Sequence, residues 1–258
     1  MESLKVKTIN DFVNAGEKPE ILFWVGSAGS FDERAKKITR AFVKILNKAN
    51  INFAVLGEQE SSSGDAAKRA GNEFLFQMQA LMNIEILNSY DITNIVTTCP
   101  HSYNTLKNEY SDLGGNYKVT HHTEFISDLI KQGKLNLTTD FNYKKITYHD
   151  PCYLGRGNDI YESPRDLIAN LNIDFVEMPR NKRKSFCCGA GGAQMFKEAE
   201  NGKFEINIIR TEEALKTGAD VIATGCPFCN TMMTDGVKNI SEGQAQVKDI
   251  AELIAECI

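Results

Sequence analysis

Short apolar runs of strand character alternate along this chain with longer stretches in which apolar residues recur at helical spacing. This pattern predicts strands at Ile21–Val25, Asn52–Leu56, Asn94–Thr98, Ile146–Tyr148, Asp174–Met178 and Val221–Thr224. It predicts helices at Glu33–Ala49, Ala66–Tyr90, Tyr103–Tyr110, Thr123–Lys131, Pro164–Asn170, Lys203–Thr217, Asn230–Asp235 and Val247–Glu256. Strands that alternate with helices are typical of α/β folds with mainly parallel sheets.

The same order of elements occurs twice, with an offset of about 125 residues. We therefore expect two similar, Rossmann-like α/β repeats. The polar, glycine-containing segment Lys131–Tyr143 is the expected join between them. The predicted domains are residues 1–135 and residues 136–258.

Each repeat places three loops directly after predicted strands, where open α/β sheets form their binding sites. In the second repeat these loops carry five of the seven cysteines: Cys152, Cys187, Cys188, Cys226 and Cys229. In the first repeat serine occupies the matching places, and a single cysteine remains. The matching residues are Ser27, Ser62 and Ser63, each 125 positions earlier, and Cys99 and Ser102, each 127 positions earlier.

Five clustered thiols indicate a site for a soft metal, such as an iron–sulfur cluster or zinc. Cys226-Pro227-Phe228-Cys229 is a short chelating turn found in both kinds of site. The adjacent pair Cys187-Cys188 can reach one centre only across a kinked loop, which the glycines after it permit. Structural zinc takes four ligands, so five cysteines favour a multi-iron cluster, with zinc as the alternative.

The spacing Cys-x34-Cys-Cys-x37-Cys-x-x-Cys, from Cys152 to Cys229, resembles the cysteine-rich CCG domain. That domain occurs in pairs in the B and D subunits of heterodisulfide reductase. It also occurs in the iron–sulfur subunits of enzymes that oxidise glycolate, lactate or glycerol 3-phosphate. The resemblance implies an α/β domain whose five cysteines hold a 4Fe-4S-type cluster, for which a noncubane form is open. It also implies ferredoxin-like and flavin-containing partner subunits.

The first repeat has a degenerate form of this motif. A neutral serine hydroxyl is a poor ligand for iron, and Cys99 alone cannot hold a cluster, so we expect no cofactor there. Cys99 is then expected to be buried and inert, although a different metal held by Cys99 and His101 is an alternative. Cys257, isolated near the end of the sequence, is expected to be a small buried hydrophobe.

The overall composition narrows the class of protein. The net charge is −5, which does not favour nucleic acid or an anionic membrane as the main partner. No apolar run reaches the roughly 20 residues of a membrane span, and the first residues lack the apolar core of a signal peptide. We therefore expect a cytoplasmic protein with reduced thiols, in which membrane association would come through a partner.

Four further features have a structural and a functional interpretation. His149 is expected to be satisfied by backbone at a strand end, although it could be a ligand or a proton donor. His121-His122 is expected to cap a helix or lie on the surface. Arg180–Lys184 is expected to be a solvated loop, or else a charged surface that offsets an anionic cluster and docks an acidic partner. Gly26–Ser30 resembles a phosphate-binding turn but lacks the dinucleotide fingerprint.

Taken together, the sequence predicts an iron–sulfur electron-transfer subunit of a multi-subunit oxidoreductase. The chain lacks a flavin fingerprint and a ferredoxin-type cysteine run, so other subunits would complete any enzyme. The competing hypothesis is a non-redox scaffold, or a zinc-stabilised assembly protein, derived from the same family. The catalytic residues and the substrate are not predicted.

Overall fold

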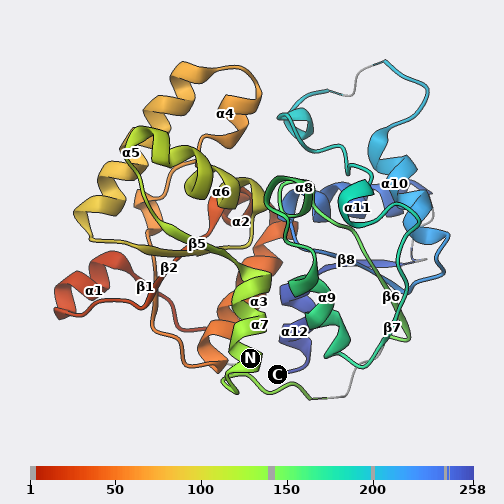
Figure 1. Cartoon of the computed structure of the whole chain (residues 1–258), viewed down its shortest axis with the longest axis horizontal. Coiled ribbons are helices and arrows are strands. Elements are labelled where there is room, and N and C mark those ends of the chain that lie inside the picture. The colour runs from red at the N-terminus through yellow and green to blue at the C-terminus, as the bar shows by residue number, and fades with distance from the viewer. Residues whose placement is uncertain (1–3, 139–142, 199–200, 241–242, 244) are drawn as a thin grey trace.

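The computed structural model describes residues 4–138, 143–198, 201–240, 243 and 245–258. These residues form two parallel β-sheets, one in each repeat, which lie side by side with helices packed around and between them (Figure 1). The predicted α/β class, the parallel sheets and the internal repeat are confirmed.

The first sheet has the strand order β1-β3-β2-β4-β5. Its strands are β1 (Lys7–Thr8), β2 (Ile21–Trp24), β3 (Phe53–Val55), β4 (Asn94–Thr97) and β5 (Lys118–His121). Its helices are α1 (Ile9–Ala15), α2 (Gly26–Phe31), α3 (Glu33–Lys48), α4 (Asp65–Arg69), α5 (Glu73–Ser89), α6 (Pro100–Asn104) and α7 (His122–Lys131). A π-helical turn, Thr105–Glu109, and a 3-10 turn, Tyr110–Leu113, continue α6.

The second sheet has the order β7-β6-β8-β9, which repeats the order β3-β2-β4-β5 of the first sheet. Its strands are β6 (Lys145–Tyr148), β7 (Asp174–Phe175), β8 (Val221–Thr224) and β9 (Gln246–Asp249). Its helices are α8 (Gly155–Asn158), α9 (Glu162–Ala169), α10 (Ile206–Leu215), α11 (Pro227–Ile240) and α12 (Ile250–Glu256).

The structure corrects several predicted boundaries. Each repeat has an edge strand that was not predicted, β5 or β9, and each of these strands runs directly into a helix. β5 precedes the helix predicted at Thr123–Lys131, whereas β9 takes up the start of the helix predicted at Val247–Glu256. The predicted helix Ala66–Tyr90 is broken at Gly71, where φ is +85°, and Asn72 caps the new start by accepting the Leu75 N–H at 3.1 Å. Gly26–Ser30 is the short helix α2 rather than a turn. The segment between Glu33 and Lys48 is helical as predicted, with Asp32 as its cap.

Both repeats contribute to one continuous apolar core. Phe23 and Phe42 of the first repeat belong to the same buried cluster as Ile146, Tyr148 and Ile250 of the second. Burying aromatic and branched side chains is the main source of folding free energy, so the repeats stabilise one another. Leu135 also packs into this core, whereas residues 139–142 of the predicted join lie outside the described residues. The domain boundary at residues 135 and 136 stays a prediction.

Polar contacts also cross between the repeats. Arg34 in α3 makes two hydrogen bonds, at 2.8 and 2.7 Å, to the carboxylate of Glu252 in α12. His122 Nε2 lies 2.9 Å from Asp249 Oδ1, and both side chains are fully buried. Within the described parts of the chain, no helix combines the length and the apolar character that crossing a membrane requires.

Candidate metal centre

The five cysteines of the second repeat lie on three loops at the carboxyl edge of its sheet. Cys152 follows β6, and Cys187-Cys188 lies in the segment that follows β7. Cys226 follows β8, and Cys229 lies in the first turn of α11. Because parallel strands end at the same edge, these separate segments converge, as the sequence predicted.

The thiols form a continuous series of neighbours. Cys152 hydrogen-bonds to Cys187, which also contacts Cys188. Cys188 in turn contacts Cys229, and Cys229 contacts Cys226. All are free thiols, and the last three residues of the series are at least 97% buried, whereas Cys152 and Cys187 are half-buried.

Hydrogen bonds within the series divide the thiols into two kinds. Hydrogen bonds from Cys152 and Cys188, with one from the Gly189 N–H at 3.2 Å, lower the pKa of Cys187 to about 2. Burial opposes ionisation of Cys226, but hydrogen bonds from Cys229 and Cys99 outweigh burial and hold its pKa well below the ordinary value. Thiolates at these positions are the form that binds metal.

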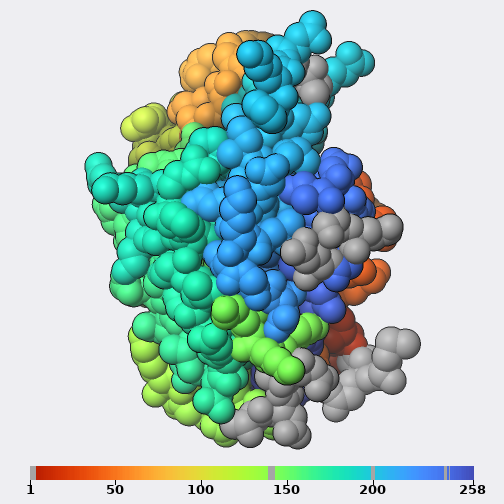
Figure 2. Space-filling model, turned by 90° about the vertical axis from the view of Figure 1, so that its right-hand side faces the viewer, coloured from red at the N-terminus to blue at the C-terminus, as the bar shows by residue number. Residues whose placement is uncertain are grey.

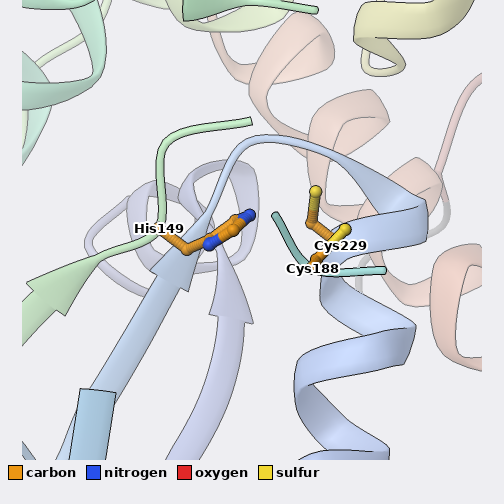
Figure 3. Close-up of side chains that lie close together, drawn as sticks. All are labelled: His149, Cys188 and Cys229. Atoms are coloured by element: carbon orange, nitrogen blue, oxygen red, sulfur yellow. The ribbon is translucent and has the colours of Figure 1, made fainter. Parts of the chain in front are cut away.

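His149 lies against this series of thiols. One ring nitrogen of His149 and the sulfurs of Cys188 and Cys229 lie within 4.8 Å of one another, and Figure 3 shows the three side chains facing each other. The His149 Nδ1 accepts a hydrogen bond at 3.0 Å from Nε of Arg210, a fully buried residue of α10. The prediction that backbone satisfies this side chain is therefore wrong. Burial, with a contribution from Arg210, lowers the pKa of His149 to about 3.

Asp150 connects the first and second ligand loops. Its carboxylate accepts two hydrogen bonds from Arg165 of α9, at 2.8 and 3.0 Å, and one from the Lys182 N–H at 2.8 Å. Its backbone carbonyl accepts the Ser185 hydroxyl at 3.1 Å. The sequence reasoning missed Asp150, Arg165 and Arg210 as supports of the site.

The basic segment Arg180–Lys184 is partly neutralised. Arg180 pairs with Glu213 at 2.8 Å, and its guanidinium lies 3.9 Å from the ring centre of Phe186. Lys182 pairs with Glu162 at 2.7 Å. Arg183 and Lys184 are exposed, so only the end of the segment nearest the cysteines is the solvated loop that was predicted.

The matching site of the first repeat is a cavity of about 80 Å³. All five of the matching positions line this cavity: Ser27, Ser62, Ser63, Cys99 and Ser102. The double-serine loop keeps the turn of the double-cysteine loop, because Ser62 Oγ accepts the Gly64 N–H at 3.2 Å as the Cys187 sulfur accepts the Gly189 N–H. The backbone N–H groups of Val25 and Gly26 donate to the carboxylate of Glu60, which weakens the interpretation of this loop as a phosphate-binding turn.

Cys99 is buried, as predicted, but it is not isolated. Its thiol hydrogen-bonds to Cys226 and so extends the series of thiols across the two repeats. His101 pairs through Nδ1 with Asp65 at 2.9 Å, and its ring lies against Tyr153 and Phe228 of the second repeat. Among the described residues, the geometry does not bring Cys99 and His101 together in a three-ligand metal site.

The pair His121-His122 is not on the surface. His121 is the N-cap of α7, which is the capping role that the sequence predicted for this pair. Its backbone N–H donates to the Glu124 carboxylate at 3.4 Å. Both histidines are fully buried at the contact between the repeats, which corrects the surface alternative. Cys257 is buried in the shared core, as predicted.

The family model of the cysteine-rich domain, CCG, matches residues 21–107 and residues 146–234. These ranges cover both repeats, including the three ligand loops of each. The chain belongs to the CCG cysteine-rich domain family.

Three curated relatives of this CCG protein carry redox names. A probable iron-sulfur-binding oxidoreductase FadF of Bacillus subtilis is 44% identical over 98% of the chain and 36% of the relative. An EtfAB:quinone oxidoreductase of Syntrophomonas wolfei is 41% identical over 95% of the chain and 35% of the relative. The D-type subunit of a heterodisulfide reductase of Methanosarcina barkeri is 32% identical over 95% of the chain and 61% of the relative. The chain thus spans about a third of the length of the first two relatives.

The residues of the second repeat fit an iron–sulfur cluster. Five soft thiol ligands lie in one unbroken series, which suits several irons that each need a terminal ligand. Ala190, Phe228 and Met232 pack around the buried thiols and form an apolar shell on this side of the site. Part of the described chain between the double cysteine and α10, residues 189–198 and 201–205, stands out from the body of the molecule (Figure 2). The four serines of the first repeat do not fit such a cluster.

Proposed function

We propose that this CCG protein is the iron–sulfur electron-transfer part of a multi-subunit oxidoreductase. The observation that carries the proposal is the unbroken series of five thiols on three converging loops. The ligands would be Cys152, Cys187, Cys188, Cys226 and Cys229. The cluster would be of the four-iron type, in a cubane or a noncubane form, and when bound it supplies one-electron transfer. The first repeat would bind no cluster.

The protein's own residues would control access to this site. The inner thiols are screened from water by the apolar shell and by the first repeat, whereas Cys152 and Cys187 are partly exposed. Electrons would therefore enter or leave on the side of these two residues. The exposed cations Arg183 and Lys184 lie on the same ligand loop, and they would favour docking of an acidic partner protein.

The length of the relatives supports the proposed partners. Proteins of about three times the length of the matched region carry names that refer to iron–sulfur binding, to EtfAB and to quinone. The flavin-containing and ferredoxin-like modules that the sequence predicts would be supplied by other subunits or by other parts of a longer chain. The free thiols support a reducing, cytoplasmic location, with any membrane contact made through a partner.

Anaerobic purification and metal analysis test this proposal. We expect a brown protein with broad visible absorbance and about four irons per chain. Cys188→Ser removes a central member of the series and should abolish iron binding. Cys257→Ser changes an equally buried thiol in the apolar core and should leave the iron content unchanged.

A zinc-stabilised scaffold is the second candidate function. It is favoured by the grouping of His149, Cys188 and Cys229, since one imidazole with several thiolates is a common zinc ligand set. The hydrogen bond that Arg210 donates to His149 Nδ1 opposes this candidate, because the lone pair of Nδ1 is then not free to bind zinc. Stoichiometric zinc without iron in the purified protein would establish the scaffold and refute electron transfer.

A further inference from the structure

The hydrogen bond between Arg210 and His149 fixes the position of a proton. A guanidinium is always protonated and can only donate, so the His149 Nδ1 that receives its N–H must offer a lone pair. Because Nδ1 is then unprotonated, the imidazole carries its proton on Nε2. This nitrogen is the ring atom farthest from the backbone, and it points toward Cys188 and Cys229 (Figure 3).

A protonated Nε2 has no lone pair for a metal. His149 therefore faces the thiols with an N–H group and not with a lone pair that could make it a sixth ligand. Hydrogen bonds to the sulfurs of a cluster stabilise its more negative, reduced state and raise the reduction potential.

We propose that His149 donates a hydrogen bond from Nε2 to the sulfur ligands Cys188 and Cys229, and that Arg210 is the positioning residue that fixes the required tautomer. The pair raises the reduction potential of the cluster in the second repeat. This inference rests on the proposed function, because it requires that the thiols hold an iron–sulfur cluster.

Arg210 is itself held in place from several sides. It is fully buried, and it donates to the backbone carbonyl of Arg180 at 2.9 Å, to Glu213 at 3.0 Å and to the Ser185 hydroxyl at 3.3 Å. A buried guanidinium with this many partners cannot turn away from the imidazole without leaving polar groups unpaired. The tautomer of His149 is thus determined by packing that extends beyond the site.

The first repeat provides an internal contrast. Three residues before its first ligand position stands Trp24, where the second repeat has His149 three residues before Cys152. Trp24 is packed in the apolar core among Leu22, Ala54 and Leu56. The repeat without the thiols therefore also lacks the imidazole.

The tautomer can be tested without any cluster. Nitrogen-15 NMR of the histidine rings in metal-free protein distinguishes the two neutral tautomers. We expect His149 to carry its proton on Nε2 in the unaltered protein. In Arg210→Lys, which keeps the charge but loses the Nε–H donor, we expect a mixture of tautomers. Observation of the Nδ1–H tautomer in the unaltered protein would overturn the proposal.

The effect on the cluster is tested by its midpoint potential, followed by EPR in the iron-loaded protein. His149→Leu keeps the bulk but removes the donor, so we expect full iron content and a shift to lower potential. His149→Gln retains a side-chain N–H, so its midpoint potential should be lowered less than that of His149→Leu. The midpoint potential of Arg210→Lys should lie between those of the unaltered protein and His149→Leu. His122→Gln alters an equally buried histidine whose partner is Asp249, and it should leave the potential unchanged.

The outcomes separate this inference from the proposed function. An unaltered protein without iron refutes both. Full iron content with an unchanged potential in His149→Leu refutes only the hydrogen-bond role. Loss of iron from both His149 variants, while metal-free protein still unfolds cooperatively, would show that His149 is a ligand and would overturn the tautomer argument.

Discussion

The double-residue loops of the two repeats have nearly the same backbone, but one carries hydroxyl groups where the other carries thiols. Gly64 and Gly189 follow the two double residues with φ of +85° and +91°, and each donates its N–H at 3.2 Å to the first residue of the pair. In one repeat the acceptor is the hydroxyl of Ser62, and in the other it is the sulfur of Cys187. The backbone therefore forms the same turn in both repeats, and a difference in metal binding would come from the side chains.

The first repeat also fills its site with a different kind of pair. His101 stands at the position of Phe228, and Asp65 stands at the position of Ala190. The carboxylate and the imidazole lie 2.9 Å apart and satisfy one another. A polar pair thus occupies the place where the second repeat has an apolar wall around its thiols.

The largest expected effect comes from changing the same position in both repeats. Cys226→Ser removes a predicted ligand and should reduce iron from about four per chain to almost none. Cys99→Ser alters the equivalent residue and should leave the iron content unchanged, because Cys99 contacts Cys226 without being needed as a ligand. Metal analysis of anaerobically prepared variants measures both. Iron loss in Cys99→Ser would mean that the first repeat contributes a sixth ligand.

The converse experiment introduces thiols at the four serine positions of the first repeat. We expect the combined change of Ser27, Ser62, Ser63 and Ser102 to cysteine to increase iron to about twice that of the unaltered protein. The retained loop geometry around Gly64 is the reason for this expectation. A variant in which only Ser61 is changed to cysteine serves as the control, since Ser61 does not line the cavity. An iron content that stays at the original level would show that the two loops are less alike than their backbones indicate.

A third prediction tests whether the repeats depend on one another for stability. Asp249→Ala removes the buried partner of His122 and the cap of α12 at once, so we expect the free energy of unfolding to fall by about 3 kcal/mol. Asp249→Asn keeps an oxygen for both contacts and should cost less. Denaturant unfolding of metal-free protein gives both values. Two separate transitions in Asp249→Ala would show that this contact couples the repeats.

The smallest effect concerns the two equivalent glycines. Alanine at either site is strained by about 1 kcal/mol because φ is positive. At Gly64 the added Cβ would also lie 2.7 Å from Cδ2 of the buried Phe76, whereas at Gly189 the nearest atom, in Ile206, is 3.3 Å away. Gly64→Ala should therefore destabilise the metal-free protein more, by about 2 kcal/mol in total.

Gly218→Ala provides the reference for strain alone. This glycine has φ of +70°, and no atom lies within 4 Å of the position of its added Cβ. Equal losses of unfolding free energy in all three glycine variants would contradict the steric difference between the repeats.

The sequence was sufficient for the repeat, the parallel sheets and the convergence of the five cysteines, because strand ends and ligand spacing are local features. It was insufficient for β5 and β9. Each of these strands mixes polar with apolar side chains, and each runs without a break into an amphipathic helix whose pattern dominates. Short edge strands are defined by their pairing, which a single sequence does not display.

The supports of the site were also missed. Arg210 is charged, and charged residues are seldom fully buried, so its residue type alone gives no indication of a place beside the site. The available signal was its position on the same helical face as Asn207, Thr211 and Ala214, which are all buried. Likewise, no local pattern could place Cys99 against Cys226, because that contact depends on how the two sheets face each other.

The ring contacts of His101 with Tyr153 and Phe228 have a consequence for the first repeat as a part of the molecule. A half that carries serine at four of the five matching positions still forms one wall of the site in the other half. Its shape therefore matters to the second site independently of any metal of its own. Removal of the whole first repeat would open the second site to water.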